Sequence, residues 1–232
     1  MSDVIMSHIF NSYYTHRALA SIGSGHHVYL VDNSFCGEMA TYCRRNPHVH
    51  YLTTTVGKKV DIDCPPGPTT RMEWHPLSCS ASWNFAMQEA QADWVINVNP
   101  DTEMLPQSLE LMEMAIDTRM DGVVLMRAPV NFNFWAADRK ALLELGGFDE
   151  RFRPCAGEDE DMLLRIGKAG MKWQRCGPPA YHQDGGHKDR MDLGIPGKGT
   201  YCNAPVFVDK WGFMPHSAEW KEIVGAAHAG GA

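Results

Sequence analysis

Short apolar runs alternate with helical segments through most of this chain, and this alternation restricts its fold more than any other feature. The runs at 27–32 and 93–99 are nearly continuous in apolar residues, as strands buried on both faces of a sheet are. Between the runs, segments such as 107–118 place apolar residues at helical spacing. The pattern predicts an α/β fold with a mostly parallel central sheet flanked by helices. The expected strands are 3–10, 27–32, 49–55, 93–99, 122–127 and 171–175, and the expected helices are 11–22, 37–46, 80–91, 107–118, 139–145 and 158–170.

Two segments depart from this alternation. Residues 57–76 contain the run CPPGP at 64–68, and proline removes backbone donors and restricts φ. We therefore expect a long irregular surface loop there, of a kind that is often functional. The last residues, 225–232, are mostly small, and we expect them to fray.

Composition narrows the functional classes. The chain has 232 residues, enough for one large domain, and its net charge of −7 makes nucleic-acid binding a poor default. No apolar run approaches the length of a membrane span, and the first residues do not resemble a signal peptide. The seven cysteines form no C-x-x-C pair, which favours reduced thiols. These features predict a cytoplasmic protein without a transmembrane segment.

An acidic run, Glu158, Asp159, Glu160 and Asp161, opens the last expected helix. A helix N-terminus favours carboxylates by about 0.3–1 kcal/mol each, which explains one or two acids but not four. Successive side chains point about 100° apart, so Glu158 and Asp161 share a face while Asp159 points elsewhere. One acid can therefore cap the helix while another enters a cleft and acts as a general base. A solvated helix start is the alternative.

Asp32 ends the expected strand 27–32 and Asp101 follows the expected strand 93–99, at the sheet edge where open parallel sheets bind ligands. A carboxylate there can hold a hard cation or receive donors from a nucleotide, although both sites also have the composition of ordinary turns. Further along, His182 and His187 lie in a glycine-rich segment that matches no zinc signature and could be a surface loop. The nucleotide-binding and hydrolase motifs GxxxxGK[ST], GxGxxG after a strand and GxSxG are absent, so nucleoside triphosphatases, dinucleotide dehydrogenases and α/β-hydrolases lose support.

In their shared order, these segments resemble the inverting, nucleotide-sugar-dependent glycosyltransferases of family 2, which have the GT-A fold. The resemblance covers roughly residues 4–189. Its most specific part is FWAADRKALLELGGFDERF at 134–152, followed by EDEDMLLR at 158–165 and GMKW at 170–173. The runs VDNS at 31–34, SWNFA at 82–86, ADWVINVNPDT at 92–102 and YH at 181–182 are similar to further family motifs.

The resemblance implies a role for each matching residue. Asp159 would be the general base, supported by Glu158, and Asp101 would bind a divalent manganese or magnesium ion. His182 would complete the metal or diphosphate site, with His187 as a competitor. The implied donor nucleotide contacts are Phe10, Asn11, Asp32, Asn84 and Asn99, and the implied acceptor contacts are Phe134, Trp135 and Lys210. The usual DxD motif reads NPD here, with Asn99 in place of its first acid, so metal affinity could be lower.

The resemblance also implies a domain layout and partners. A GT-A domain would span 1–215, with nucleotide binding in about 1–105 and acceptor binding and catalysis in about 106–215, before a tail at 216–232. The donor would be a nucleoside diphosphate sugar, more often of the UDP or TDP type. The acceptor would be a glycan or a hydroxymethylated base in DNA, which the net charge disfavours.

Two other functions stay open from the sequence. A nucleotidyltransferase of similar fold would need a glycine-rich, basic phosphate-binding loop near the first strand. Residues 21–25 are a poor candidate for such a loop. A non-catalytic sugar- or nucleotide-binding module would be expected to have lost the acidic run or Asp101, and both are present.

Overall fold

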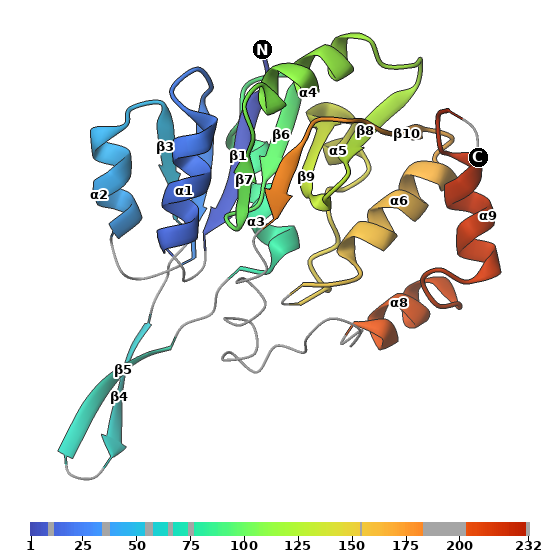
Figure 1. Ribbon diagram of the computed structural model, residues 1–232. Helices are drawn as coiled ribbons and strands as arrows, with labels where there is room; N and C mark the ends of the chain where they lie inside the picture. Colours follow the sequence, from blue (N-terminus) through green and yellow to red (C-terminus); the bar gives the residue numbers. More distant parts are fainter. Residues whose placement is uncertain are drawn as a thin grey trace.

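A seven-stranded sheet forms the centre of the protein (Figure 1). The computed structural model describes residues 1–8, 12–33, 38–53, 58–64, 67–73, 77–153, 155–182 and 203–230. The sheet has the order β10-β8-β9-β6-β1-β2-β3, in which β9 runs antiparallel to both neighbours and the other strands run parallel. Its strands are β1 (Asp3–His8), β2 (Val28–Asp32), β3 (Val49–Leu52), β6 (Trp94–Val98), β8 (Val123–Ala128), β9 (Asn131–Asp138) and β10 (Lys172–Arg175). The predicted α/β class with a mostly parallel sheet is confirmed.

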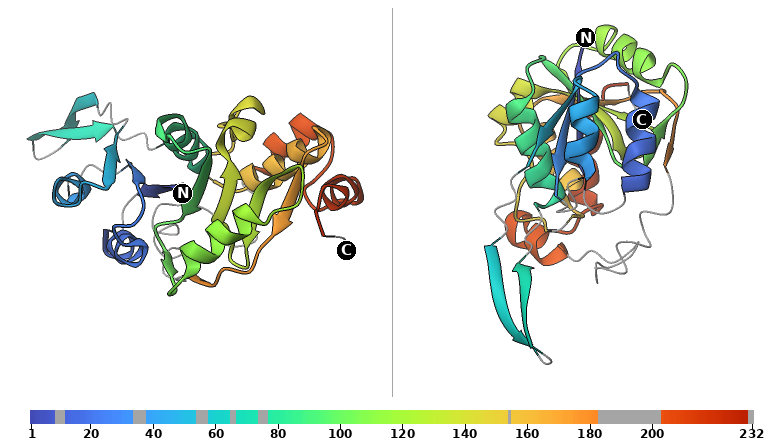
Figure 2. Two further views of the ribbon diagram at one scale, coloured as in Figure 1. Left: turned by 90° about the horizontal axis from the view of Figure 1, so that it is seen from above. Right: turned by 90° about the vertical axis from the view of Figure 1, so that its left-hand side faces the viewer.

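Helices cover both faces of the sheet, as the two views in Figure 2 show. The helices are α1 (Ser12–Ile22), α2 (Glu38–Arg45), α3 (Cys79–Glu89), α4 (Ser108–Asp117), α5 (Arg139–Glu144), α6 (Glu158–Lys168), α8 (Ala204–Trp211) and α9 (Ala218–Ala226). Every residue of β1, β2 and β6 is buried, which explains why their sequences do not alternate with polar residues. Within the described ranges, no helix combines the length and apolar character needed to cross a bilayer.

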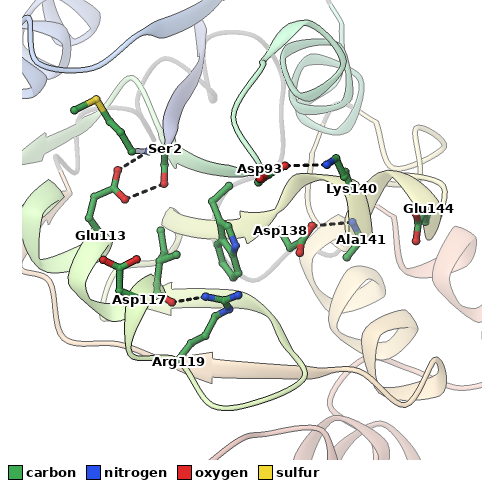
Figure 3. A pocket seen from close by; sticks show the side chains of 12 residues that line it. Ser2, Asp93, Glu113, Asp117, Arg119, Asp138, Lys140, Ala141 and Glu144 are labelled. Carbon is green, nitrogen blue, oxygen red and sulfur yellow. Dashed lines mark hydrogen bonds and ion pairs between the residues drawn. The ribbon is translucent and has the colours of Figure 1, made fainter.

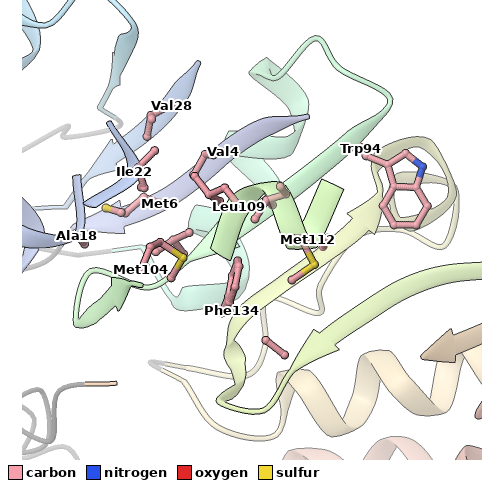
Figure 4. Close-up of a cluster of buried hydrophobic side chains, with 14 of the residues drawn as sticks. Val4, Met6, Ala18, Ile22, Val28, Trp94, Met104, Leu109, Met112 and Phe134 are labelled. Carbon is pink, nitrogen blue, oxygen red and sulfur yellow. The ribbon is translucent and has the colours of Figure 1, made fainter. Parts of the chain in front are cut away.

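Two hydrophobic clusters make up the core, one on each face of the sheet. Val4 and Met6 of β1 join α1, α2 and α4 in the first cluster, part of which Figure 4 shows. Ile5, between them in sequence, joins α3, α5, α6, α8 and α9 in the second. Successive strand side chains point to opposite faces, so one apolar strand supplies both clusters.

The expectation of an irregular loop at 57–76 is wrong. Strands β4 (Lys58–Cys64) and β5 (Gly67–Glu73) form an antiparallel hairpin, with Cys64 opposite Gly67 at its closed end. The hairpin projects away from the main sheet (Figure 1). Pro68 is compatible with strand β5 because a two-stranded ribbon has outer edges where a backbone donor is not required.

Residues 225–230 are packed against the rest of the protein, which corrects the expectation of fraying for this described part of the segment 225–232. Helix α9 packs on α6, and Trp173 Nε1 donates a hydrogen bond to the Val224 carbonyl at 2.9 Å. Beyond the helix, Ala229 is buried and its backbone N–H bonds to the Trp173 carbonyl at 2.8 Å. Small residues allow this close packing against the edge strand β10. The division of the chain at residue 215 stays a prediction.

Candidate active site

The parallel strands end at one edge of the sheet, the lower edge in Figure 1. Asp32 is the last residue of β2, Asn99 follows β6, and Arg127 lies near the end of β8. Helix α6, with the acidic run, begins near this edge (Figure 1). The topology thus brings together polar residues that are distant in sequence.

Asp32 is fully buried at the end of β2. The Tyr51 hydroxyl donates to Asp32 Oδ2 at 3.0 Å, and burial followed by this hydrogen bond raises the pKa of Tyr51 to about 12. The neighbouring Asn33 donates to Ser82 Oγ at 2.9 Å and so ties β2 to α3. Nucleotide binding by Asp32 stays a prediction, and the Phe10 and Asn11 sites lie outside the described residues. Sequence reasoning missed Tyr51, although its position on the adjacent strand was a signal.

An amide chain links the ends of β6 and β9. Asn97 Nδ2 donates to Asn99 Oδ1 at 3.0 Å, and Asn99 Nδ2 donates to Asn133 Oδ1 at 2.8 Å. The neutral Asn99, which replaces an acid of the DxD pattern, is therefore engaged with two other amides. Its predicted contact with the nucleotide stays a prediction.

Asp101 and His182 meet beside this amide chain. His182 Nε2 lies 3.2 Å from Asp101 Oδ2, although the residues are 81 positions apart. Strand β11 (Ala180–His182) pairs with β7 (Thr102–Met104), and this pairing sets His182 opposite Thr102. The two side chains are 21% and 14% exposed, so both are reachable from solvent. The structure brings together the two residues that the sequence singled out for a metal. His187 lies outside the described residues.

The Asp101 carboxylate and the His182 imidazole are suitable ligands for a divalent cation, but they make up only part of a metal site. Carboxylate oxygen suits both Mg²⁺ and Mn²⁺, and imidazole nitrogen is a common ligand of transition metals. Among the described residues, no group of three or more His, Cys, Asp or Glu side chains could hold a metal ion. A cation at Asp101 and His182 would therefore need further ligands from substrate or water.

The acidic run divides as helical spacing predicts. Glu158 and Asp161 are buried on a shared face, 6% and 0% exposed, while Asp159 and Glu160 are half-buried. The N-cap is Gly157, whose φ of 97° is left-handed and which offers no side-chain cap. A Cβ there would lie 2.9 Å from the Phe152 ring. The N-cap residue is therefore not an acid, although Asp159 Oδ1 accepts a hydrogen bond from the Glu160 backbone N–H in the first turn at 3.2 Å.

Asp161 is the centre of a buried ionic network. Its Oδ2 accepts a hydrogen bond from Arg165 Nε at 2.8 Å. Its Oδ1 accepts one from Trp211 Nε1 at 2.8 Å and lies 2.8 Å from Lys210 Nζ. Lys210 Nζ also lies 2.8 Å from Asp149 Oδ2. The ammonium group is thus held by two carboxylates that join α6, α8 and the turn after α5. This arrangement gives no support to acceptor binding by Lys210.

Asn84 holds the turn that carries the GGFDE sequence. Its Nδ2 donates to the Phe148 carbonyl at 2.8 Å and to Glu150 Oε1 at 3.0 Å, and its Oδ1 accepts from Phe148 N at 2.7 Å. Gly147 has a φ of 68°, and a Cβ on it would lie 2.9 Å from Asn84 Cγ. The amide of Asn84 is buried and hydrogen-bonded within the chain, and nucleotide binding by Asn84 stays a prediction.

The two predicted aromatic acceptor residues belong to the core. Phe134 is fully buried in the first cluster, and Trp135 is fully buried in the second. Neither ring can offer a stacking face to an acceptor. The prediction is wrong because these residues alternate along β9, a central strand that was not recognised in the sequence.

Glu160 and Arg127, to which sequence reasoning gave no separate role, both interact with the charge of Asp159. Burial, followed by a hydrogen bond and the charge of Asp159, raises the pKa of Glu160. The Arg127 guanidinium lies 5.4 Å from the Phe132 ring centre and 4.7 Å from that of Trp173. Burial lowers the pKa of Arg127, while the charge of Asp159 opposes the change. Arg127 ends an expected strand, so the strand-end reasoning applied to Asp32 would have found it.

A cavity of about 600 Å³ lies elsewhere, between α4, α5 and the start of β6 (Figure 3). Ser2, Asp93 and Asp138 line it, and Lys140 pairs with Asp93 at its rim. None of the predicted site residues lines this cavity. Its position at the opposite ends of the strands separates it from the acidic run and the Asp101–His182 pair.

Comparisons with solved structures identify the architecture. No family model and no curated protein matches the chain. S. aureus TarS 1-349 superposes with a TM-score of 0.59 at 12% identity, over 97% of this chain and 70% of that one. The same TarS fragment in complex with UDP-GlcNAc gives 0.51 at 13% identity, over 71% of this chain and 53% of that one. A third structure is glucosyl-3-phosphoglycerate synthase from Mycobacterium tuberculosis, in complex with Mn²⁺, UDP and glucosyl-3-phosphoglycerate. It superposes with a TM-score of 0.57 at 12% identity, over 86% of this chain and 82% of that one. The chain therefore has the fold of the GT-A glycosyltransferases.

Proposed function

We propose that this protein is an inverting glycosyltransferase that moves a sugar from a nucleoside diphosphate sugar to an acceptor hydroxyl. The observation that carries the proposal is the contact between Asp101 and His182 at the carboxyl end of β6. Two chemically suitable metal ligands meet there in a fold shared with proteins solved with UDP-GlcNAc and with UDP and Mn²⁺. A donor of the UDP or TDP type is part of the proposal.

The donor end of the site would be built from strand-end residues. Asp101 and His182 would hold Mn²⁺ or Mg²⁺, with the remaining ligands supplied by the diphosphate and water. The cation would act as a Lewis acid that stabilises negative charge on the departing diphosphate. Asp32 and Asn99 would bind the nucleotide, and the side chains of Tyr51 and Asn133 already restrict their orientation.

The acceptor end of the site would be the start of α6. Asp159 would take the proton of the acceptor hydroxyl, whose oxygen would then attack the sugar from the side opposite the leaving group and invert its configuration. Asp159 lies in the first turn of α6, where the helix N-terminus is favourable for a carboxylate, and the Arg127 guanidinium is a positive charge that acts on it. Glu158, buried on the other face of α6, would support the helix start.

The acceptor itself is proposed by class. The net charge of −7 favours a glycan over a hydroxymethylated base in DNA. With Phe134 and Trp135 in the core, the described residues include no predicted aromatic pair on which a flipped base would stack. A cytoplasmic location, expected from the cysteines without a C-x-x-C pair, belongs to the same proposal.

Thermal stabilisation by nucleoside diphosphates, with and without Mn²⁺, tests the donor site. A ligand at a hundredfold excess over its Kd stabilises the folded state by about 2.7 kcal/mol. We expect a metal-dependent shift with UDP or TDP, and we expect Asp101→Asn to remove the metal dependence. A folded protein that no nucleotide stabilises would argue against the proposal.

The Asp159→Asn variant separates an enzyme from a binding module. We expect its turnover to collapse while nucleotide binding survives, because the amide cannot accept the acceptor proton. Asp93→Asn, at the opposite end of β6, is the matched control and should keep full turnover. Equal turnover of the Asp159 variant and the wild type would refute the base assignment. Release of a nucleoside diphosphate rather than pyrophosphate would exclude the nucleotidyltransferase alternative.

A further inference from the structure

We propose that Asn133 is a positioning residue for the cation site of Asp101 and His182. It holds the turn that carries Asp101, and the amide chain of Asn97, Asn99 and Asn133 requires a hydrogen-bond donor at residue 99. This inference rests on the proposed function and deepens it, because it brings β9 into the cation site. It also gives a physical reason for the amide that stands where the DxD pattern has its first acid.

Asn133 holds Asn99 at two points. The Asn99 backbone N–H donates to the Asn133 carbonyl at 2.9 Å, and Asn99 Nδ2 donates to Asn133 Oδ1 at 2.8 Å. The Asn99 carbonyl accepts from the Thr102 N–H at 2.9 Å and so closes the turn in which Asp101 lies. Thr102 is in turn paired with His182 between β7 and β11. The contacts of Asn133 thus reach the turn that brings both members of the cation site together.

Backbone carbonyls fix the direction of the amide chain at both ends, because a carbonyl can only accept. Asn133 Nδ2 donates to the Val130 carbonyl at 3.0 Å, so its Oδ1 is the atom that faces Asn99. At the other end, Asn97 Nδ2 lies 3.0 Å from Asn99 Oδ1 and 3.5 Å from the Phe132 carbonyl. Asn99 must therefore offer a donor to one neighbour and an acceptor to the other, and a primary amide does both.

An acid at residue 99 would break this chain. A carboxylate has no donor, so its oxygen would face Asn133 Oδ1 where Asn99 Nδ2 now lies, 2.8 Å away. Turning the Asn133 amide over would not relieve the contact, because its oxygen would then face the Val130 carbonyl. The turn can therefore present one carboxylate, that of Asp101, and its position depends on the amide chain.

The Mn²⁺ requirement of UDP binding tests the role of Asn133 without turnover. Calorimetric titrations with UDP at a series of Mn²⁺ concentrations give the Mn²⁺ concentration that half-saturates binding. Asn133→Ala should raise it about tenfold, as the loss of an outer partner of a metal ligand does. Asn46→Ala is the matched control, since Asn46 Nδ2 also donates to a backbone carbonyl, that of Tyr42 at 2.9 Å, beyond the opposite end of the strands. Equal values for Asn133→Ala and the control would overturn the inference.

Asn99→Asp gives a test with the opposite sign from simple electrostatics. The added acid restores the DxD pattern, yet we expect Mn²⁺ binding to weaken about tenfold, because the turn loses its anchor. In the Asn99→Asp background, Asn133→Ala removes the facing oxygen and should strengthen Mn²⁺ binding, so the two changes should not be additive. Tighter Mn²⁺ binding by Asn99→Asp alone would overturn the inference. This variant replaces one NH₂ group by oxygen, so it carries the test even where Asn133→Ala does not fold.

Hydrogen exchange in the protein without metal or nucleotide is an independent readout. In Asn133→Ala, the Thr102 N–H should exchange about fivefold faster than in the Asn46→Ala control, as the weakening of one hydrogen bond implies. An unchanged rate would overturn the inference. If the wild type binds UDP with Mn²⁺ and Asn133→Ala matches the control, only this inference fails. If the wild type binds no nucleotide at any Mn²⁺ concentration, the proposed function fails and the positioning role fails with it.

Discussion

Asp161→Asn removes the negative charge around which α6 and α8 are arranged. Asp161 is 0% exposed and has three partners at 2.8 Å, namely Arg165, Lys210 and Trp211. Asparagine keeps the shape of the side chain but cannot balance two cations, and its NH₂ group would replace an acceptor with a donor. The arrangement predicts a large loss of stability from the replacement of one carboxylate oxygen by an NH₂ group.

The structure sets the expected magnitude. Removing one partner of a buried ion pair costs about 3–5 kcal/mol, because the other charge is left unbalanced. Arg165 and Lys210 are 14% and 19% exposed, and Lys210 keeps Asp149 as a partner. These features favour the lower end, about 3 kcal/mol. For a chain of this size, each kcal/mol lowers Tm by about 2–4 °C, so we expect a decrease of about 6–12 °C.

Equilibrium unfolding in urea, followed by circular dichroism, measures the effect. Asp93→Asn is the matched control, since Asp93 and its partner Lys140 are 76% and 67% exposed and such pairs contribute little. We expect the control to keep the wild-type midpoint. A midpoint for Asp161→Asn equal to that of the control would refute the view that the network stabilises the fold.

Three further predictions concern the scaffold of the site. Gly147→Ala should cost at least about 1 kcal/mol in urea unfolding, because φ is left-handed and the new Cβ would displace Asn84. Although burial acts in the other direction, hydrogen bonds from Arg151 and Lys210 hold the pKa of Asp149 well below its ordinary value. Asp149 therefore stabilises the fold above its unfolded pKa of about 4, and this contribution is lost as pH falls through the folded value. In Asp149→Asn, Tm should therefore depend less on pH below about pH 4 than it does in the wild type. Trp173→Phe leaves the Val224 carbonyl without its donor, and it should cost about 1 kcal/mol and speed hydrogen exchange in α9. The predictions would be contradicted by an unchanged urea midpoint in Gly147→Ala, an unchanged pH dependence of Tm in Asp149→Asn, or an unchanged hydrogen-exchange rate in Trp173→Phe.

Local patterns predicted the parts of the fold that depend on local physics. The buried strands at 28–32 and 94–98 were recognisable because a strand covered on both faces must be apolar throughout. The division of the acidic run followed from the geometry of one helix, which buries Glu158 and Asp161 together. Asp32 and Asp101 were recognisable because they lie at the carboxyl ends of such strands.

Other features depended on contacts that no local pattern contains. Strand β9 enters the sheet between β8 and β6, and this pairing buries the aromatic rings that were expected to bind an acceptor. The hairpin of β4 and β5 forms through cross-strand pairing despite its prolines. The hydrogen-bond partners of Asn84 lie 64 and 66 residues away. In each case, the identity of the neighbour decided the role of the residue.

The sequence by itself determined the α/β class, the edge of the sheet that carries polar residues and the helix that begins with four acids, because each follows from periodicity over a few residues. Only the tertiary structure decided that His182 meets Asp101, that Asp161 is neutralised by Arg165 and Lys210, and that the C-terminal segment reaches Glu160. Charges and hydrogen bonds act over a few ångströms in space, whatever the separation along the chain, so these roles arise only when the chain has folded.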